Sequence, residues 1–176
     1  MGLLRNRRWV NGLGFLACAA LMAYALYAEV VLGLEPCPLC VFQRVAVISL
    51  GLVFLAAALH HPRGRLGARL YAGLLAVAAG GGVAVAGQHV RLQGLPEDEV
   101  PACGPGLDFM LDVFPLHEAV MMVFSGSGEC AEIDWAFLGL SMPAWVLLAC
   151  LGLGVFGVVG NWLGGPQPSS RERMSA

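Results

Sequence analysis

Four long stretches free of Asp, Glu, Lys and Arg constrain what this chain can fold into. They cover residues 9–28, 45–59, 70–88 and 135–165. In a helix, about 20 residues cross the ~30 Å hydrocarbon core of a bilayer. Backbone groups in lipid must find partners within the segment, and β-barrel strands would be shorter and alternating. We therefore predict an all-α membrane protein that forms a four-helix transmembrane bundle. The spans are expected at about 9–28, 40–59, 70–89 and 143–162.

Composition agrees with the membrane class. Only 12% of the residues are charged, against about 25% in soluble domains, and the mean hydropathy is +0.74. The chain has no lysine and no dense basic run, so nucleic acid is not an expected partner. The letters "RNRR" and "AYA" imitate a secretion signal, but the first apolar run is longer than a typical signal core. We predict that it is retained as a span.

The arginines predict the orientation in the membrane. Eight of the ten lie before the first span, between the second and third spans, or after the fourth. The positive-inside rule makes that side cytoplasmic, and eleven of the twelve acidic residues lie toward the other side. Both termini are thus predicted to be cytoplasmic, with outer loops at about 29–39 and 90–142. Residues 1–165 form one membrane domain in this interpretation, and 166–176 form a disordered tail.

The second outer loop carries one amphipathic pattern. Leu107, Met110, Leu111 and Phe114 recur at i, i+3, i+4 and i+7, which predicts a short helix with one apolar face. Such a helix suits the membrane interface. A short helix packed on the end of the bundle fits the pattern nearly as well, and both placements stay open.

The six cysteines divide by position. Cys18 and Cys150 fall within spans and are expected to be small buried hydrophobic residues. The other four, in the predicted outer loops, are Cys37, Cys40, Cys103 and Cys130. An exported, oxidising setting makes disulfides the default for these four.

The outer cysteines form two pairs with different surroundings. Cys37-Pro-Leu-Cys40 has the C-x-x-C spacing of dithiol redox chemistry. Cys103 and Cys130 lie among glycines and prolines, which suits a loop that another protein reaches and that then rearranges. A static staple is the alternative. A zinc site built from all four lacks the paired spacing of common zinc motifs, so no metal is predicted.

Two further residues are candidates near the C-x-x-C. If the second span begins near Cys40, the helix dipole favours a thiolate there. Arg44 lies at i+4 on the same face, and its candidate partners are that thiolate and the oxygen of an electron acceptor in the lipid; snorkelling to headgroups is the alternative. His89, at the outer end of the third span, is placed to approach this region, although a hydrogen-bonded interface histidine explains it too.

Together these features resemble the DsbB family. The resemblance covers about residues 9–163 and is carried by "CPLCVFQR", "QHVRLQ", "PACG" and "GECAEIDWAFLGLSMPAW". It implies a protein-dithiol:quinone oxidoreductase of the bacterial inner membrane that reoxidises a periplasmic DsbA-like thiol oxidase. It further implies a four-helix bundle with a short interfacial helix, embedded in the lipid bilayer and linked to the membrane quinone pool.

Residue roles also follow from the resemblance. Cys103, paired with Cys130 at rest, resembles the cysteine that reduced DsbA attacks. Cys37 and Cys40 resemble the pair that takes the electrons onward. Cys40 resembles the thiolate that faces the quinone ring, and Arg44 the arginine near a quinone oxygen; His89 is added as a third quinone-binding candidate.

Three other interpretations are weighed. A structural membrane subunit with stapled loops has no use for an arginine at i+4 from a C-x-x-C. A metal-handling membrane protein would carry more soft ligands within its spans. A vitamin-K-epoxide-reductase-like enzyme has its C-x-x-C near the end of the helical core, whereas here it follows the first span. The choice between ubiquinone and menaquinone stays open.

Overall fold

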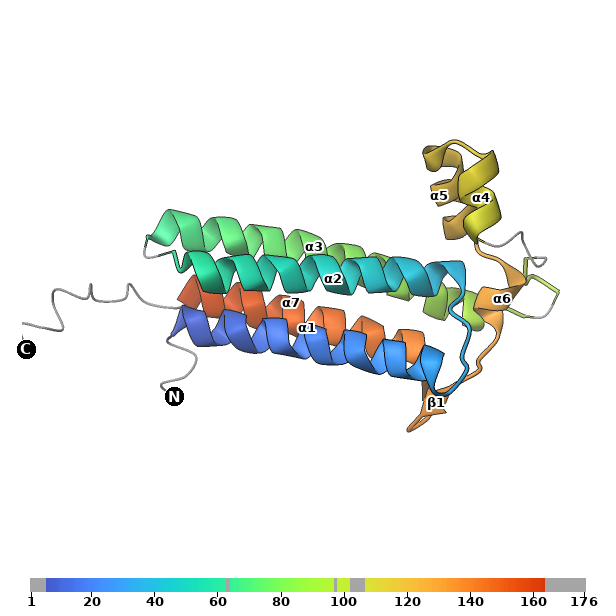
Figure 1. Cartoon of the computed structure of the whole chain (residues 1–176), viewed down its shortest axis with the longest axis horizontal. Coiled ribbons are helices and arrows are strands. Elements are labelled where there is room, and N and C mark those ends of the chain that lie inside the picture. The colour runs from blue at the N-terminus through green and yellow to red at the C-terminus, as the bar shows by residue number, and fades with distance from the viewer. Residues whose placement is uncertain (1–5, 63, 97, 102–106, 164–176) are drawn as a thin grey trace, which may run out of the picture.

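The computed structural model describes residues 6–62, 64–96, 98–101 and 107–163. Four long helices lie side by side as a bundle (Figure 1). They are α1 (Arg7–Val30), α2 (Pro38–His60), α3 (Arg65–Gln93) and α7 (Met142–Leu163). All four are long and apolar enough to cross a membrane, which confirms the four-span all-α prediction. The predicted tail at 166–176 lies outside the described residues.

The smaller elements all lie between α3 and α7 and gather at one end of the bundle (Figure 1). They are α4 (Leu107–Val113), α5 (Leu116–Ser125), α6 (Gly128–Ala131), β1 (Ala136–Phe137) and β2 (Leu140–Ser141). We call this end, which also holds Cys37, His89 and Cys130, the cysteine end. The opposite end, where α1 begins and α7 finishes, is the termini end.

The helix predicted over residues 107–114 is confirmed as α4, whereas α5 was not predicted. Met110 of α4 is buried in an apolar cluster with Leu92 of α3 and Val123 of α5. Figure 1 shows α4 and α5 standing out beside the end of the bundle, and both placements of this helix stay predictions.

The centre of the bundle is packed around Phe54 of α2. Its ring is fully buried with Leu50 and Leu75. A Cβ on Gly157 of α7 would lie 2.8 Å from this ring, so the close approach of the two helices requires glycine there. Cys18 and Cys150 belong to the same buried cluster, as predicted for cysteines within spans.

At the termini end, α1 and α7 are joined by two buried asparagines. Asn11 Nδ2 donates to Asn161 Oδ1 at 3.0 Å, and Asn161 Nδ2 donates back to Asn11 Oδ1 at 2.9 Å. Each amide also donates to a carbonyl one turn earlier on its own helix, that of Arg7 or Gly157. In a low-dielectric bundle such a reciprocal pair leaves little polar capacity unmet.

Candidate functional site

Cys37 and Cys40 form the start of α2. Cys37 has extended backbone at the N-cap, its sulfur accepts from the Cys40 N–H at 3.4 Å, and Pro38 occupies the first helical position. Proline suits that position because its fixed φ is helical and it lacks an N–H that would go unpaired. Both cysteines are free thiols whose sulfurs lie 3.1 Å apart. The C-x-x-C is therefore itself the helix N-terminus.

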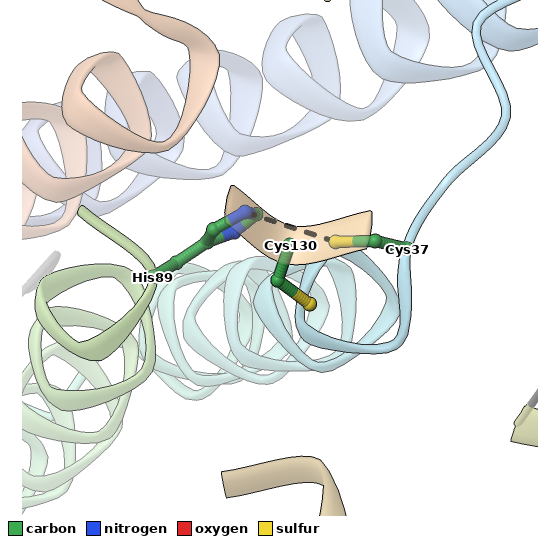
Figure 2. Close-up of side chains that lie close together, drawn as sticks. All are labelled: Cys37, His89 and Cys130. Carbon is green, nitrogen blue, oxygen red and sulfur yellow. Dashed lines mark hydrogen bonds between the residues drawn. The ribbon is translucent and has the colours of Figure 1, made fainter. Parts of the chain in front are cut away.

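Cys130 of α6 lies beside Cys37, although the two are far apart in sequence. The sulfurs of Cys37 and Cys130 and a ring nitrogen of His89 all lie within 4.8 Å of one another. In Figure 2 the side chains of His89, from α3, and Cys37, from the N-cap of α2, point toward each other, and Cys130 of α6 lies beside them. The two loops at the cysteine end thus bring one cysteine of each predicted pair into contact range.

Cys130 is not the accessible loop thiol that its glycine-rich surroundings suggested, because only 1% of it is exposed. It is packed against Leu39 and Val123. The hydrogen bond with Cys37, followed by burial, raises the pKa of the Cys130 thiol, while a contact with the Ser127 hydroxyl at 3.6 Å opposes that change. In the free-thiol state Cys130 therefore favours its protonated form.

Close packing holds α6 in this place. Gly126, just before it, has φ of +87°, and a Cβ there would lie 2.5 Å from Leu92 Cδ1. Only glycine meets both demands. Gln88 Nε2 also donates to the Phe124 carbonyl at 3.0 Å, which ties the end of α5 to α3. The "SGSGEC" segment is consequently a packed turn.

His89 approaches the C-x-x-C as predicted, but through Cys37. Its Nε2 lies 3.8 Å from Cys37 Sγ, and its Nδ1 lies 2.8 Å from the side-chain amide of Gln43. His89 and Gln43 are both buried. Gln43 follows Cys40 by three residues, so the start of α2 supplies both the thiols and the group that orients the imidazole.

Arg44 has a partner that the sequence did not predict. Its guanidinium donates to the Glu29 carboxylate, and it also approaches the Ala25 carbonyl at 3.5 Å. The two predicted partners of Arg44 were the Cys40 thiolate and an acceptor oxygen, so the pairing with Glu29 corrects the picture of a bare charge. A carboxylate at the end of an apolar span was the signal available, since such a group requires a cation or water.

A cavity of about 770 Å³ opens beside these groups. Its polar lining includes Cys37, Cys40, Gln43, Arg44, His89 and Glu29, and its aromatic lining includes Tyr24, Trp135, Phe137 and Trp145. The β1–β2 turn positions the aromatic part: Trp135 stacks on Phe137, and Trp145 Nε1 donates to the Phe137 carbonyl at 3.1 Å. Volumes of roughly 300–1,000 Å³, mostly apolar with a few convergent polar groups, are typical of small-molecule sites.

Of the six predicted site residues, five are described, and all five lie at this end of the bundle. The cavity is lined by Cys37, Cys40, Arg44 and His89. Cys130 lies beside Cys37. Cys103 lies outside the described residues, so its pairing with Cys130 stays a prediction.

The fold and site define a class, a multi-pass membrane protein with a thiol cluster beside a cavity at one end of its helix bundle. Comparison with known proteins narrows this class. The profile of the family described as "Disulfide bond formation protein DsbB" matches residues 7–160. A protein named disulfide bond formation protein B from Methylococcus capsulatus is 56% identical over 150 residues, which cover 85% of this chain and 91% of that protein.

Two further relatives carry the same name. The one from Nitrosococcus oceani is 57% identical over 148 residues, covering 84% of this chain and 87% of its own length. The one from Marinobacter nauticus is 55% identical over 151 residues, covering 83% and 89%. The chain therefore belongs to the DsbB family of disulfide bond formation proteins, and it is a disulfide-forming protein of the inner membrane.

Proposed function

We propose that this protein is a protein-dithiol:quinone oxidoreductase, which reoxidises a periplasmic DsbA-like thiol oxidase and passes the electrons to membrane quinone. Its cysteine end would then face the periplasm and both termini the cytoplasm. The observation that carries the proposal is the contact between the two outer loops: Cys130 lies within 4.8 Å of Cys37, and Cys37 adjoins Cys40 on the wall of the cavity.

The first exchange opens the pair in the second loop. A thiolate of the reduced partner attacks Cys103 in a Cys103–Cys130 disulfide, that bond breaks, and Cys130 leaves as a thiolate. The hydrogen bond with Cys37, followed by burial, raises the pKa of the Cys130 thiol in the reduced state. A thiolate of high pKa is strongly nucleophilic, but only a small fraction of such a thiol is ionised. Cys130 is therefore released beside its next target, and the attack on Cys37 proceeds through the ionised fraction.

The second exchange moves the oxidising equivalent between the loops. The Cys130 thiolate attacks Cys37 Sγ in a Cys37–Cys40 disulfide, a Cys37–Cys130 bond forms, and the electron pair of the broken bond leaves on Cys40. Cys40 lies in the first turn of α2, where the helix dipole stabilises negative charge. A stabilised thiolate is the faster leaving group, so the direction of attack follows from the position of each sulfur.

The cavity residues fit a quinone. When bound there, a quinone supplies a two-electron, two-proton acceptor. Arg44 and His89 provide donors on the cavity wall, and the aromatic residues gathered around the β1–β2 turn provide an apolar wall for a ring. Glu29 keeps the Arg44 guanidinium neutralised and oriented at the edge of the apolar region. These are the features expected of a site that holds a polar ring head and an apolar tail.

A quinone also suits the energetics. A DsbA-type oxidase is a strong oxidant, at about −120 mV, and its compartment is kept oxidising kinetically. Reoxidation therefore needs an acceptor that respiration continually drains, and a lipid-soluble one is reached from within the bilayer.

The test uses the full chain in detergent with a reduced DsbA-like protein and either ubiquinone or menaquinone. We expect one quinone to be consumed for each partner disulfide formed. Quinone consumption is measured as the loss of the quinone's ultraviolet absorbance. Cys130→Ser should stop this transfer, while Cys18→Ala, which changes a cysteine remote from the cavity, should not. If neither quinone is consumed and the loop disulfides persist in the presence of the reduced partner, the cysteines are structural staples.

A further inference from the structure

Cys37, His89 and Cys130 have the donor set of a soft-metal site. We propose that these three side chains, when the thiols are reduced, bind one divalent ion of the zinc type. The site is distinct from the zinc site of four cysteines that the spacing argues against, because it uses His89 and omits both Cys40 and Cys103. Bound metal would occupy the two sulfurs that the relay needs, a consequence that rests on the proposed function.

The distances suit a tetrahedral ion. With Zn–S of about 2.3 Å and Zn–N of about 2.0 Å, two ligand atoms of one tetrahedron lie roughly 3.5–3.8 Å apart. Cys37 Sγ and His89 Nε2 lie 3.8 Å apart, and no pair among the three ligand atoms exceeds 4.8 Å. Rotations of the two cysteine side chains are therefore enough to complete the coordination.

The surroundings favour a defined site over a chance contact. The three ligands come from the starts or ends of three separate elements (Figure 2), and His89 and Cys130 are almost fully buried. The side-chain amide of Gln43 lies 2.8 Å from His89 Nδ1. In the structure it is the Gln43 amide nitrogen that faces Nδ1. Rotation of this amide by about 180° brings its oxygen to the ring, so that it accepts the Nδ1 hydrogen and leaves Nε2 as the ligand atom. Such second partners orient most metal-binding histidines.

Binding is an exchange of protons and involves no electron transfer. Two thiols release their protons to solvent, and the hydrated ion loses all but one of its waters. Two metal–sulfur bonds and one metal–nitrogen bond form in their place, and the remaining water keeps the fourth position. A protein whose Cys37 is in a disulfide has no such ligand to offer. The site therefore exists only in the reduced enzyme.

The experiment uses the full chain in detergent, fully reduced and free of quinone, and titrates it with Co²⁺ as a visible probe and Zn²⁺ as its competitor. We expect one Co²⁺ per chain, with sulfur-to-cobalt charge-transfer absorbance that Zn²⁺ abolishes. His89→Ala and Cys130→Ser should each weaken binding by at least about tenfold, as should Gln43→Leu. His117→Ala, which removes an exposed histidine of α5, is the matched control and should leave binding unchanged.

Cys40→Ser separates this proposal from chelation by the C-x-x-C alone. The proposal predicts that Cys40→Ser still binds and Cys130→Ser does not, whereas a simple C-x-x-C chelate predicts the reverse. The reverse pattern, or no binding by the reduced wild type, would overturn the proposal. Because neither quinone nor a partner protein is present, the result is independent of whether the chain reduces quinone.

Protection from alkylation serves as a test that needs no variant. Zn²⁺ should slow the labelling of Cys37 and Cys130 together, read by mass spectrometry of the peptides, while Cys40 continues to react. Equal protection of Cys37 and Cys40 with Cys130 unprotected would contradict the proposed ligand set even if every variant failed to fold.

Discussion

The two ends of the bundle bury polar groups in different ways. At the termini end, Asn11 and Asn161 bond reciprocally at 2.9–3.0 Å. At the cysteine end, the His89 ring is well anchored on one side by Gln43, while its other nitrogen has a looser contact, with the Cys37 sulfur at 3.8 Å. That side adjoins a cavity of about 770 Å³. The asparagine pair satisfies its own hydrogen-bonding groups, whereas His89 keeps a ring nitrogen able to form a further bond and has open space beside it.

The two ends of the bundle therefore differ in role: the termini end stabilises the fold, and the cysteine end carries the chemistry. A polar network with every group paired stabilises one helix arrangement and offers nothing to a ligand. A network with thiols and an imidazole nitrogen in loose contact can form new bonds without breaking the fold. Changes at the termini end should therefore alter stability, and changes at the cysteine end should alter activity.

The largest expected effect is the loss of activity in Cys40→Ser. A hydroxyl does not exchange with disulfides, so quinone-dependent oxidation of a dithiol protein should fall to background. Stability should stay within about 0.5 kcal/mol of the wild type, as for most substitutions away from core packing. Quinone-dependent rates check the predicted loss of activity, and thermal unfolding in detergent checks the predicted stability. A large loss of stability would contradict the different roles assigned to the two ends.

The opposite pattern is expected for Asn161→Leu. The change leaves the Asn11 amide buried without its partner, which costs about 1–3 kcal/mol, while activity per folded molecule should be unchanged. The double variant Asn11→Leu and Asn161→Leu removes both amides and should regain most of the loss. A double variant as unstable as the sum of the singles would show that the pair is not a closed unit.

An effect on quinone binding alone is expected for Arg44→Ala. Loss of a charged donor beside the cavity, worth about 1.5–3 kcal/mol, should raise the KM for quinone by about tenfold or more and leave the exchange between Cys130 and Cys37 intact. Arg69→Ala is the control from the other end, since Arg69 lies over the Trp162 ring at 5.2 Å. Equal effects of both variants would point to general loss of membrane packing.

The smallest effect is a shift in the pH profile of Cys130 alkylation in the reduced protein. Since the hydrogen bond with Cys37 and burial raise its pKa, its labelling rate should keep rising at pH values where an ordinary thiol, of pKa about 8.5, has levelled off. Cys37→Ala removes the larger cause and should move the profile to lower pH. Ser127→Ala removes a contact that lowers the pKa and should move it to higher pH.

Much of the bundle was predictable because its signals are local. Uncharged runs locate α1, α2, α3 and α7, and a period near 3.6 residues locates α4. The C-x-x-C at the start of α2 was also predictable, since Pro38 suits the first position of a helix.

The pairings across loops were not predictable. The sequence around Arg44 does not identify Glu29 as its partner, because Glu29 lies 15 residues earlier on another helix. The burial of Cys130 depends on how Gly126 packs on Leu92. A glycine-rich sequence alone predicts a mobile loop as readily as a packed turn. Such contacts depend on how α3, α5 and α6 meet, which is a property of the tertiary fold.

The most direct test of the account is whether Cys37 and Cys130 form a disulfide with each other. In a Cys40→Ser and Cys103→Ser double variant, mild oxidation followed by mass spectrometry of the linked peptides should find the Cys37–Cys130 bond in most molecules. It should form faster than any bond to Cys18 or Cys150. If Cys37 and Cys130 stay reduced, or pair only between separate molecules, the two loops do not meet as described and the relay through them is wrong.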